Sequence, residues 1–298
     1  MVTHRIEFIN MSKITVIIGP TAIGKSELAI TLARKQNAEI ISADAFQVYK
    51  GMDIGTAKVS KPILEEIPHH LIDILDPNDS YNVVDFVHRT SKIVDELRSK
   101  NTPIIMCGGT GMYLHAFLYK YQFPNETSTN SDIKTKLQER YKNEGIEIMY
   151  KELTDINPEL KDTIHINNHK RVLRNLEILI ENGQKPTDLK KQSKTIRDDV
   201  EIIGLTAERD LIYERINQRV ITMIDQGLIE EVRSLIEKYP KDSYAFQALG
   251  YKETIAALNG GYDEKEMIEL IQRKTRNFAK RQLTWFKRLN NVKWRNII

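Results

Sequence analysis

The chain has 298 residues, of which 41% are hydrophobic and 29% charged, a balance typical of a folded globular protein. Its one cysteine, Cys107, excludes an internal disulfide framework and any zinc site built from cysteines. No apolar run is long enough to span a membrane, and residues 1–10 lack the apolar centre of a signal peptide, so we expect a cytoplasmic protein with no membrane partner.

The net charge of +3 is unevenly distributed. Residues 273–298 hold nine basic residues and no acidic one, which leaves 35 basic and 41 acidic residues in the rest of the chain. A basic segment that also carries Trp285 and Trp294 is a candidate nucleic-acid surface. A solvated helix face whose tryptophans pack on the core explains this pattern equally well.

The first predicted element is the apolar run 14–18, which is typical of a buried parallel strand. It leads into a G-x-x-x-x-G-K-[ST] motif, and a helical pattern follows from Glu27. The loop N–H groups and the helix N-terminus form a cradle for a diphosphate, Lys25 adds a mobile charge, and Ser26 is placed to bind Mg²⁺. A chance glycine-rich turn is the alternative, but the strand before and the helix after the loop favour phosphate binding. The predicted diphosphate-binding residues are Gly19, Pro20, Thr21, Ala22, Ile23, Gly24, Lys25 and Ser26.

Strands and helices alternate in the first 120 residues. Further strands are predicted at 38–42, 72–75 and 103–107, with a long amphipathic helix that begins after the cap Asn82 and another that ends near Leu118. This alternation predicts an α/β fold with a parallel sheet and helices on both faces, whose ligands bind at the carboxyl ends of the strands.

That rule brings three segments to one crevice: the phosphate loop, residues 44–49 and residues 108–110. P-loop phosphotransferases carry an acid at the end of a second strand that helps to hold Mg²⁺. Here strand 103–107 ends in Gly-Gly-Thr, and the acid is Asp44, on the opposite side of the crevice. It can accept a proton there from an incoming nucleophile, although capping of a turn is an alternative role.

After residue 121 the alternation stops. Residues 123–200 are charged and mostly helical, so we interpret them as an inserted all-helical domain in a core formed by 11–122 and 201–298. Residues 1–10 are expected to be a disordered extension. The remaining predicted elements are a strand at 201–205 and helices at 211–226, 229–238, 251–259 and from the cap Asp263 to about residue 289.

Several longer motifs make the interpretation more specific. They are GPTAxGKS at 19–26, SADAxQxYKGMDIGTAK at 42–58, GGTGxY at 108–113, NHKRVLR at 168–174, ALGYKE at 248–253 and AKRQLTWF at 279–286. With these segments the chain resembles the tRNA dimethylallyltransferase family from residue 14 to about residue 294.

This resemblance implies a P-loop NTPase-like core, similar to nucleoside kinases, and a helical insertion that holds the tRNA anticodon stem-loop. The implied reaction transfers the dimethylallyl group from dimethylallyl diphosphate to N6 of adenosine 37, in tRNAs that read codons starting with U. Diphosphate is then the leaving group, and Mg²⁺ bound at Ser26 is the expected cofactor.

The family's functional positions correspond to named residues of this chain. The implied catalytic residues are Asp44 as general base, Thr110 beside the reacting centre, Lys25 on the diphosphate, and Arg209 and Arg215 near the substrate phosphates. The expected tRNA contacts are Asp44, Ala45, Phe46, Gln47, Lys170, Arg171, Arg174, Lys280 and Arg281.

Two other classes of protein stay open. The fold is compatible with an ATP-dependent nucleoside or shikimate-type kinase, but this chain lacks the acid that such kinases carry at the end of a second strand. A non-catalytic RNA-binding P-loop protein is the other alternative, but it gives Asp44 and Thr110 no role. The pairs His69-His70 and His165 with His169 have no companion cysteines, so we reject a metal site there. We expect a monomer, since one anticodon arm fills one crevice.

Overall fold

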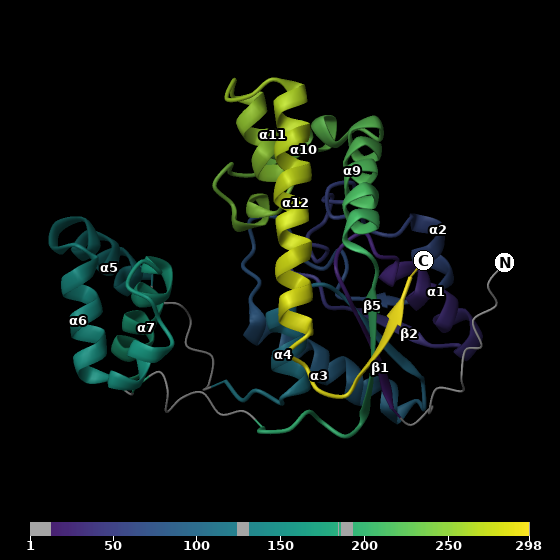
Figure 1. The fold of residues 1–298 in the computed structure, drawn as a ribbon, viewed down its shortest axis with the longest axis horizontal. Coiled ribbons are helices and arrows are strands. Elements are labelled where there is room, and N and C mark those ends of the chain that lie inside the picture. Colours follow the sequence, from purple (N-terminus) through teal and green to yellow (C-terminus); the bar gives the residue numbers. More distant parts are fainter. Residues whose placement is uncertain (1–12, 124–130, 184, 186–192, 298) are drawn as a thin grey trace. The chain divides into compact units, whose positions relative to one another are not determined.

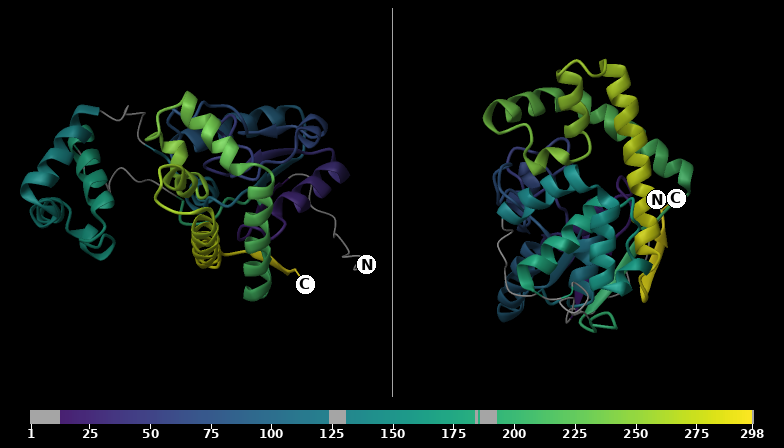
Figure 2. Two further views of the ribbon diagram at one scale, coloured as in Figure 1. Left: turned by 90° about the horizontal axis from the view of Figure 1, so that it is seen from above. Right: turned by 90° about the vertical axis from the view of Figure 1, so that its left-hand side faces the viewer.

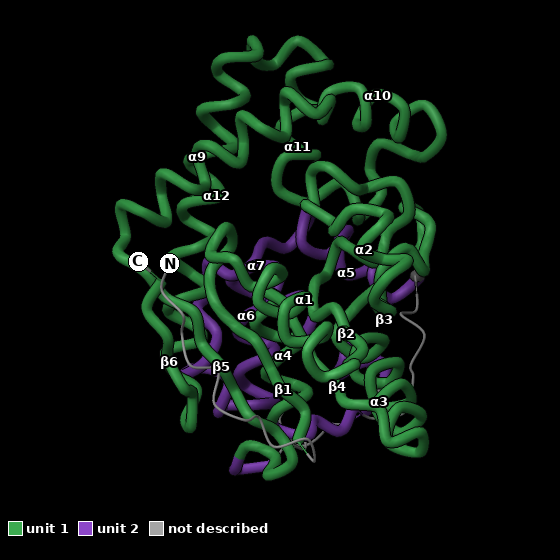
Figure 3. Tube along the Cα trace, turned by 90° about the vertical axis from the view of Figure 1, so that its right-hand side faces the viewer, with its two compact units in different colours: residues 1–118, 196–298 green, residues 119–195 purple. Residues whose placement is uncertain are grey.

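The structure, a computed structural model, describes most of the chain. The described residues are 13–123, 131–183, 185 and 193–297 (Figure 1). The described residues divide into two compact units, one within residues 1–118 and 196–298 and the other within residues 119–195 (Figure 3). The boundaries expected from the sequence, 123 and 200, differ from these by a few residues. The expected extension at 1–10 lies outside the described residues.

Six strands of the described chain form one parallel sheet in the first unit, in the order β3-β2-β4-β1-β5-β6. The strands are β1 (Ile14–Ile18), β2 (Glu39–Ser42), β3 (His69–His70), β4 (Ile104–Cys107), β5 (Val200–Thr206) and β6 (Val292–Asn296). The runs predicted at 14–18, 38–42, 103–107 and 201–205 therefore all form strands.

Helices flank this sheet, which confirms the predicted α/β class. The predicted cap Asn82 begins α3, because its side chain accepts hydrogen bonds from the backbone N–H groups of Val84 and Asp85. The α-helices of the first unit are α1 (Lys25–Gln36), α2 (Lys61–Glu66), α3 (Val83–Ser99), α4 (Gly111–Leu118), α9 (Arg209–Asp225), α10 (Leu228–Lys238), α11 (Tyr251–Leu258) and α12 (Glu264–Phe286), with a short 3₁₀ helix, η2 (Tyr244–Gln247).

The core holds α12 close to the sheet. One apolar cluster joins Ile17 and Ile203 of the sheet to Leu32 of α1, Ile216 of α9 and Ala279 of α12. Figures 1 and 2 show that α12 runs alongside α9 and extends from α11 at one end to α4 at the other. The C-terminal helix therefore reaches the turn that follows β4.

Two sequence predictions about the sheet are wrong. The strand predicted at 72–75 lies instead at His69–His70, because the backbone turns through positive φ at Leu71 and Asp73, and Leu75 forms only an isolated bridge with Tyr49. The edge strand β6 was not predicted. Its basic, partly exposed residues resemble a solvated segment, and its pairing with β5 becomes evident only in the fold.

The regular elements described in the second unit are all helices. This unit contains α5 (Ser131–Glu144), α6 (Ile146–Ile156), α7 (His169–Asn182) and a 3₁₀ helix, η1 (Pro158–Asp162). Its small apolar core includes Leu137 of α5, Met149 and Leu153 of α6, and Val172 and Leu176 of α7. Helix α7 thus has an apolar stripe at helical spacing and an exposed opposite side.

Candidate active site

The predicted crevice forms at the carboxyl ends of three adjacent strands. β4 lies between β1 and β2, and the register places both Ile17 and Ser42 beside Cys107. A pocket of about 100 Å³ opens where these strands end. The three loops and the ends of the strands and helix that they join contribute Thr21, Lys25, Ser26, Ser42, Asp44, Gln47, Cys107, Gly108 and Gly109 to its lining.

The phosphate loop has the backbone that its motif predicts. Ala22 and Gly24 have positive φ values of 62° and 95°, so the chain curls before α1. Lys25 Nζ donates a hydrogen bond of 2.7 Å to the carbonyl oxygen of Pro20 within the loop. Burial lowers the pKa of Lys25 to about 8, and the nearby charge of Arg219 also lowers it. An anionic ligand in the loop would favour the charged ammonium and raise this pKa again.

Asp44 occupies the opposite side of the pocket. Its Oδ1 accepts hydrogen bonds from the backbone N–H groups of Phe46, at 2.9 Å, and Gln47, at 3.3 Å. Asp44 therefore does cap a turn, but this uses one carboxylate oxygen. No donor of the described residues reaches the other oxygen, Oδ2, so it is available to accept a proton. The capping and general-base roles are compatible.

Thr110 is fixed beside Asp44 by two hydrogen bonds. Its Oγ1 accepts from the backbone N–H of Ala45 at 3.0 Å, and its own N–H donates to the carbonyl oxygen of Ala43 at 3.2 Å. The hydroxyl proton is then free to be donated to a ligand or a carboxylate. Thr110 thus links the turn after β4 to the residues on either side of Asp44.

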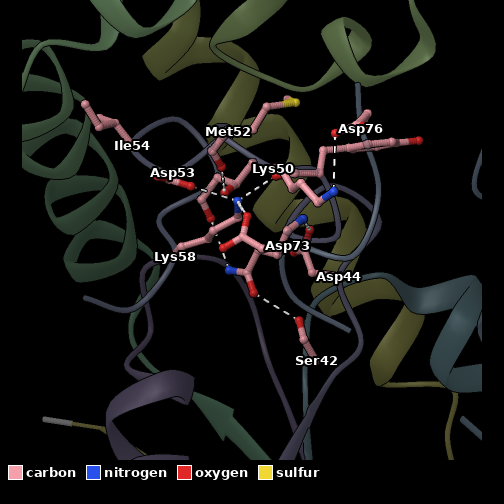
Figure 4. Close-up of polar contacts among 12 residues, drawn as sticks. Ser42, Asp44, Lys50, Met52, Asp53, Ile54, Lys58, Asp73 and Asp76 are labelled. Atoms are coloured by element: carbon pink, nitrogen blue, oxygen red, sulfur yellow. Dashed lines mark hydrogen bonds and ion pairs between the residues drawn. The ribbon is translucent and has the colours of Figure 1, made fainter. Parts of the chain in front are cut away.

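Polar contacts within the segment from Ser42 to Lys58, and with Asp73, help to hold it in place (Figure 4). Gln47 Oε1 accepts from Ser42 Oγ at 2.9 Å, and Gln47 Nε2 donates to the carbonyl oxygen of Thr56 at 3.2 Å. For Gln47 to hydrogen-bond an RNA base, its amide must share or exchange the hydrogen bonds with Ser42 and Thr56. Lys58, whose side chain is 2% exposed, bonds the carbonyl oxygen of Tyr49 and the carboxylates of Asp53 and Asp73.

The sequence prediction missed three residues that line the pocket from α9 and α12: Arg219, Phe278 and Gln282. Arg219 Nη1 donates to Thr21 Oγ1 at 3.4 Å. Arg219 lies one helical turn after Arg215, so the sequence already indicated that the two arginines share a face of α9. Phe278 and Gln282 are likewise one turn apart, but only the packing of α12 on the β4 turn brings them to this site.

Arg209 and Arg215 do not line this pocket. Arg209 is the first residue of α9, its side chain is 79% exposed, and its guanidinium lies 5.6 Å from the centre of the Tyr213 ring. Arg215 is partly buried on the same helix. Arg219 is therefore the α9 arginine nearest to the phosphate loop, and roles for the other two stay predictions.

The residues expected to contact tRNA are dispersed. The Phe46 ring stacks on Tyr244 of η2, with ring centres 6.1 Å apart and planes 21° apart. Lys280 and Arg281 are exposed on α12. Lys170, Arg171 and Arg174 are exposed on α7 of the second unit, where Arg174 pairs with Glu177 at 2.8 Å. Their contact with RNA stays a prediction.

One pocket residue, Ser26, is a suitable ligand for a magnesium ion that arrives with a phosphate ligand. Ser26 lies at the start of α1 and lines the pocket. The described residues contain no group of three or more His, Cys, Asp or Glu side chains that could hold a metal. Mg²⁺ commonly binds through one or two protein oxygens together with substrate phosphates and water, so the Ser26 hydroxyl fits as its protein ligand.

Comparison with known proteins assigns the chain to a family. A family model described as IPP transferase matches residues 47–289. The chain belongs to this family. It is 45% identical to a tRNA dimethylallyltransferase of Alkaliphilus metalliredigens, over 96% of this chain and 92% of that protein. The enzyme is therefore a transferase of the prenyltransferase type, as the motifs predicted.

Solved structures agree with the assignment and with the P-loop NTPase-like fold. The tRNA isopentenylpyrophosphate transferase of Bacillus halodurans matches with a TM-score of 0.69 and 38% identity, over 96% of this chain and 90% of its own. A eukaryotic dimethylallyltransferase acting on tRNA matches with a TM-score of 0.81 and 28% identity, over 96% of this chain and 74% of that chain. Within the described part of this chain, no helix is both long and apolar enough to cross a membrane.

Proposed function

We propose that this protein transfers the dimethylallyl group of dimethylallyl diphosphate to N6 of adenosine 37, in tRNAs that read codons starting with U, and releases diphosphate. The observation that carries the proposal is a single pocket with a phosphate loop on one side and Asp44 on the other. A donor bound by its diphosphate would point its allylic carbon toward the side that holds the acid. The substrate also leads us to propose a cytoplasmic location.

In this reaction the allylic C–O bond breaks and a C–N bond forms at N6. Negative charge grows on the departing diphosphate, where the loop N–H groups, Lys25 and Arg219 can neutralise it. Mg²⁺ bound at Ser26 would supply further positive charge to the same oxygens. The adenine amine loses one proton as the new bond forms, and Asp44 Oδ2 can accept it.

The adenine must leave the stacked anticodon loop to enter the pocket, at a cost of a few kcal/mol. Phe46 and Tyr244 offer a pair of stacked aromatic rings beside the Asp44 turn, and aromatic rings commonly hold unstacked RNA bases. The exposed cations of α7 and α12 are suited to bind the phosphates of the anticodon stem. We propose that one chain, acting as a monomer, binds one anticodon arm.

The test is mass spectrometry of unmodified tRNA after incubation with the protein, Mg²⁺ and dimethylallyl diphosphate. We expect one C5H8 unit on the fragment that contains adenosine 37, and no requirement for ATP. A mass gain that depends on ATP would instead indicate a kinase. Binding of tRNA without any mass gain would indicate an RNA-binding protein without this activity. Transcripts with adenosine 37 replaced by guanosine provide the matched control.

A further inference from the structure

One buried side chain connects the two sides of the pocket. Gln282 of α12 is 5% exposed, and both ends of its carboxamide are hydrogen-bonded. Its Oε1 accepts from the backbone N–H of Thr21 at 2.8 Å, and its Nε2 donates to the carbonyl oxygen of Gly109 at 2.9 Å. Thr21 belongs to the phosphate loop, and Gly109 belongs to the turn after β4.

The contacts continue from Gly109 to the acid. Gly109 precedes Thr110, which bonds to the backbone of Ala43 and Ala45 on either side of Asp44. Hydrogen bonds therefore join the phosphate loop to Gln282, Gln282 to the turn after β4, and that turn to the segment around Asp44. A shift of the Gln282 amide would change the separation between the diphosphate cradle and the acid.

Helix α12 packs closely on the turn after β4 around Gln282. A Cβ added to Gly109 would lie 2.3 Å from Gln282 Nε2, and one added to Gly111 would lie 2.9 Å from the ring of Trp285. Helix α12 is thus in direct contact with the turn after β4, and a side chain at either glycine position would displace a residue of α12. The buried neighbours Ala279 and Phe286 hold the same face of α12 in the core.

The chemistry of the contact also restricts the side chain. The Thr21 N–H needs an acceptor and the Gly109 carbonyl needs a donor, so one neutral group must provide both. A carboxamide does this, whereas an ionised carboxylate lacks the donor and an apolar side chain lacks both. Any buried amide needs hydrogen-bond partners, but this need alone does not explain why both partners of Gln282 belong to loops of the pocket.

We propose that Gln282 is a positioning residue, whose carboxamide holds the phosphate loop at a fixed separation from the Gly109–Thr110 turn so that the donor carbon and the adenine amine meet in the geometry for transfer. This inference rests on the proposed function. Gln282 does not need to touch either substrate. Its loss should therefore reduce the rate of the chemical step much more than it reduces the affinity for either substrate.

The test uses Gln282→Met, which retains the length of the side chain but removes both hydrogen bonds. We expect the single-turnover rate at saturating donor and tRNA to fall by about 10- to 100-fold, because small displacements of reacting groups cost that much. The dissociation constants for diphosphate and tRNA should change by less than about threefold. Gln272→Met is the matched control, since Gln272 lies on α12 and donates to the Asn217 carbonyl oxygen, outside this pocket.

A second variant distinguishes loss of the Gln282 hydrogen bonds from misfolding of Gln282→Met. Gly109→Ala leaves Gln282 intact but pushes its amide away, so it should give the same loss of rate with retained binding. If the rates of Gln282→Met and Gly109→Ala fall no further than that of Gln272→Met, the positioning role is wrong. Equal losses of rate and affinity would also contradict it. If the wild-type protein transfers no group to tRNA, the proposed function fails instead.

Discussion

Positive charge is held in two different ways in this protein. In the pocket, Lys25 and Arg219 are partly buried and bonded to the phosphate loop. On the helix faces, Lys170 and Lys280 are exposed to solvent, and Arg174 of α7 is also exposed, although its partner Glu177 is buried. At 4 Å, two unit charges interact by about 1 kcal/mol in water but about 4 kcal/mol at the effective dielectric constant near a protein surface.

Because the pocket cations are partly buried and the helix-face cations are exposed, we expect the two groups to have different roles. Groups fixed in the pocket can act on charge that develops during the reaction, because they need little rearrangement. Exposed cations are expected mainly to attract RNA, and salt screens them beyond about 10 Å at 0.1 M ionic strength. Variants of the pocket should therefore change the chemical step, and variants of the helix faces should change binding.

The largest effect is expected for Asp44→Asn, which keeps the size of the side chain but cannot accept a proton as a carboxylate does. Positioned general bases contribute about 10²- to 10⁴-fold, so we expect a loss of that order in single-turnover rate. The affinity for tRNA should change by less than about tenfold. The measurement is single-turnover transfer across a Mg²⁺ titration. Recovery of rate at high Mg²⁺ would show that Asp44 holds the metal and is not the base.

Lys25→Ala should have the next largest effect, a loss of about 10²-fold in the rate at saturating donor, because one donor to the developing negative charge is removed. Binding of tRNA should change much less. Quenched-flow kinetics with prebound tRNA measure the first quantity and a filter-binding assay the second. An unchanged single-turnover rate would show that Lys25 and its loop have only a structural role.

The lowered pKa of Lys25 adds a pH signature to this prediction. Free Lys25 is an ammonium below about pH 8 and becomes neutral as the pH rises through that value. Affinity for diphosphate should therefore be highest below pH 8 and fall by up to about tenfold per pH unit above it. Calorimetric titrations of wild type and Lys25→Ala from pH 7 to 10 measure this. Parallel pH profiles of the two proteins would contradict the assignment.

A smaller effect is expected for Lys58→Met, which leaves the carboxylates of Asp53 and Asp73 facing each other without the buried ammonium. Because both carboxylates retain partial access to water, we expect a loss of about 1–2 kcal/mol in the free energy of unfolding. Urea denaturation measures it. Lys50→Met is the control, since Lys50 pairs with Asp76 at 3.5 Å on the surface and should cost under about 0.5 kcal/mol. Equal losses would show that burial of Lys58 adds nothing.

The smallest effects are expected on the helix faces. Each of Lys170→Gln, Arg174→Gln and Lys280→Gln should weaken tRNA binding modestly and lower the slope of log affinity against log salt by somewhat less than one. Diphosphate affinity should not change. Lys142→Gln on α5 is a control outside the predicted contact set. Slopes equal to that of wild type would identify these residues as a solvated face.

Much of the pocket follows from sequence because its motifs are local. A short apolar strand followed by the glycine-lysine-serine loop has few other solutions, and Asp44 follows its own strand directly. The rule that parallel strands present ligands at their carboxyl ends then placed the phosphate loop, Asp44 and the β4 turn together. The sequence alone therefore determined which loops meet, and it predicts that they bind a diphosphate.

Only the tertiary structure decided which helices complete the pocket. Arg219 and Gln282 are about 200 and 260 residues from Thr21 in the chain, yet both bond to it, and no local pattern encodes that approach. The same reason explains the error at 72–75 and the missed strand β6, since positive φ at Leu71 and the pairing of Trp294 with Gly204 depend on neighbours distant in sequence. Side chains on a helix reach a site only through packing, and packing is a property of the whole fold.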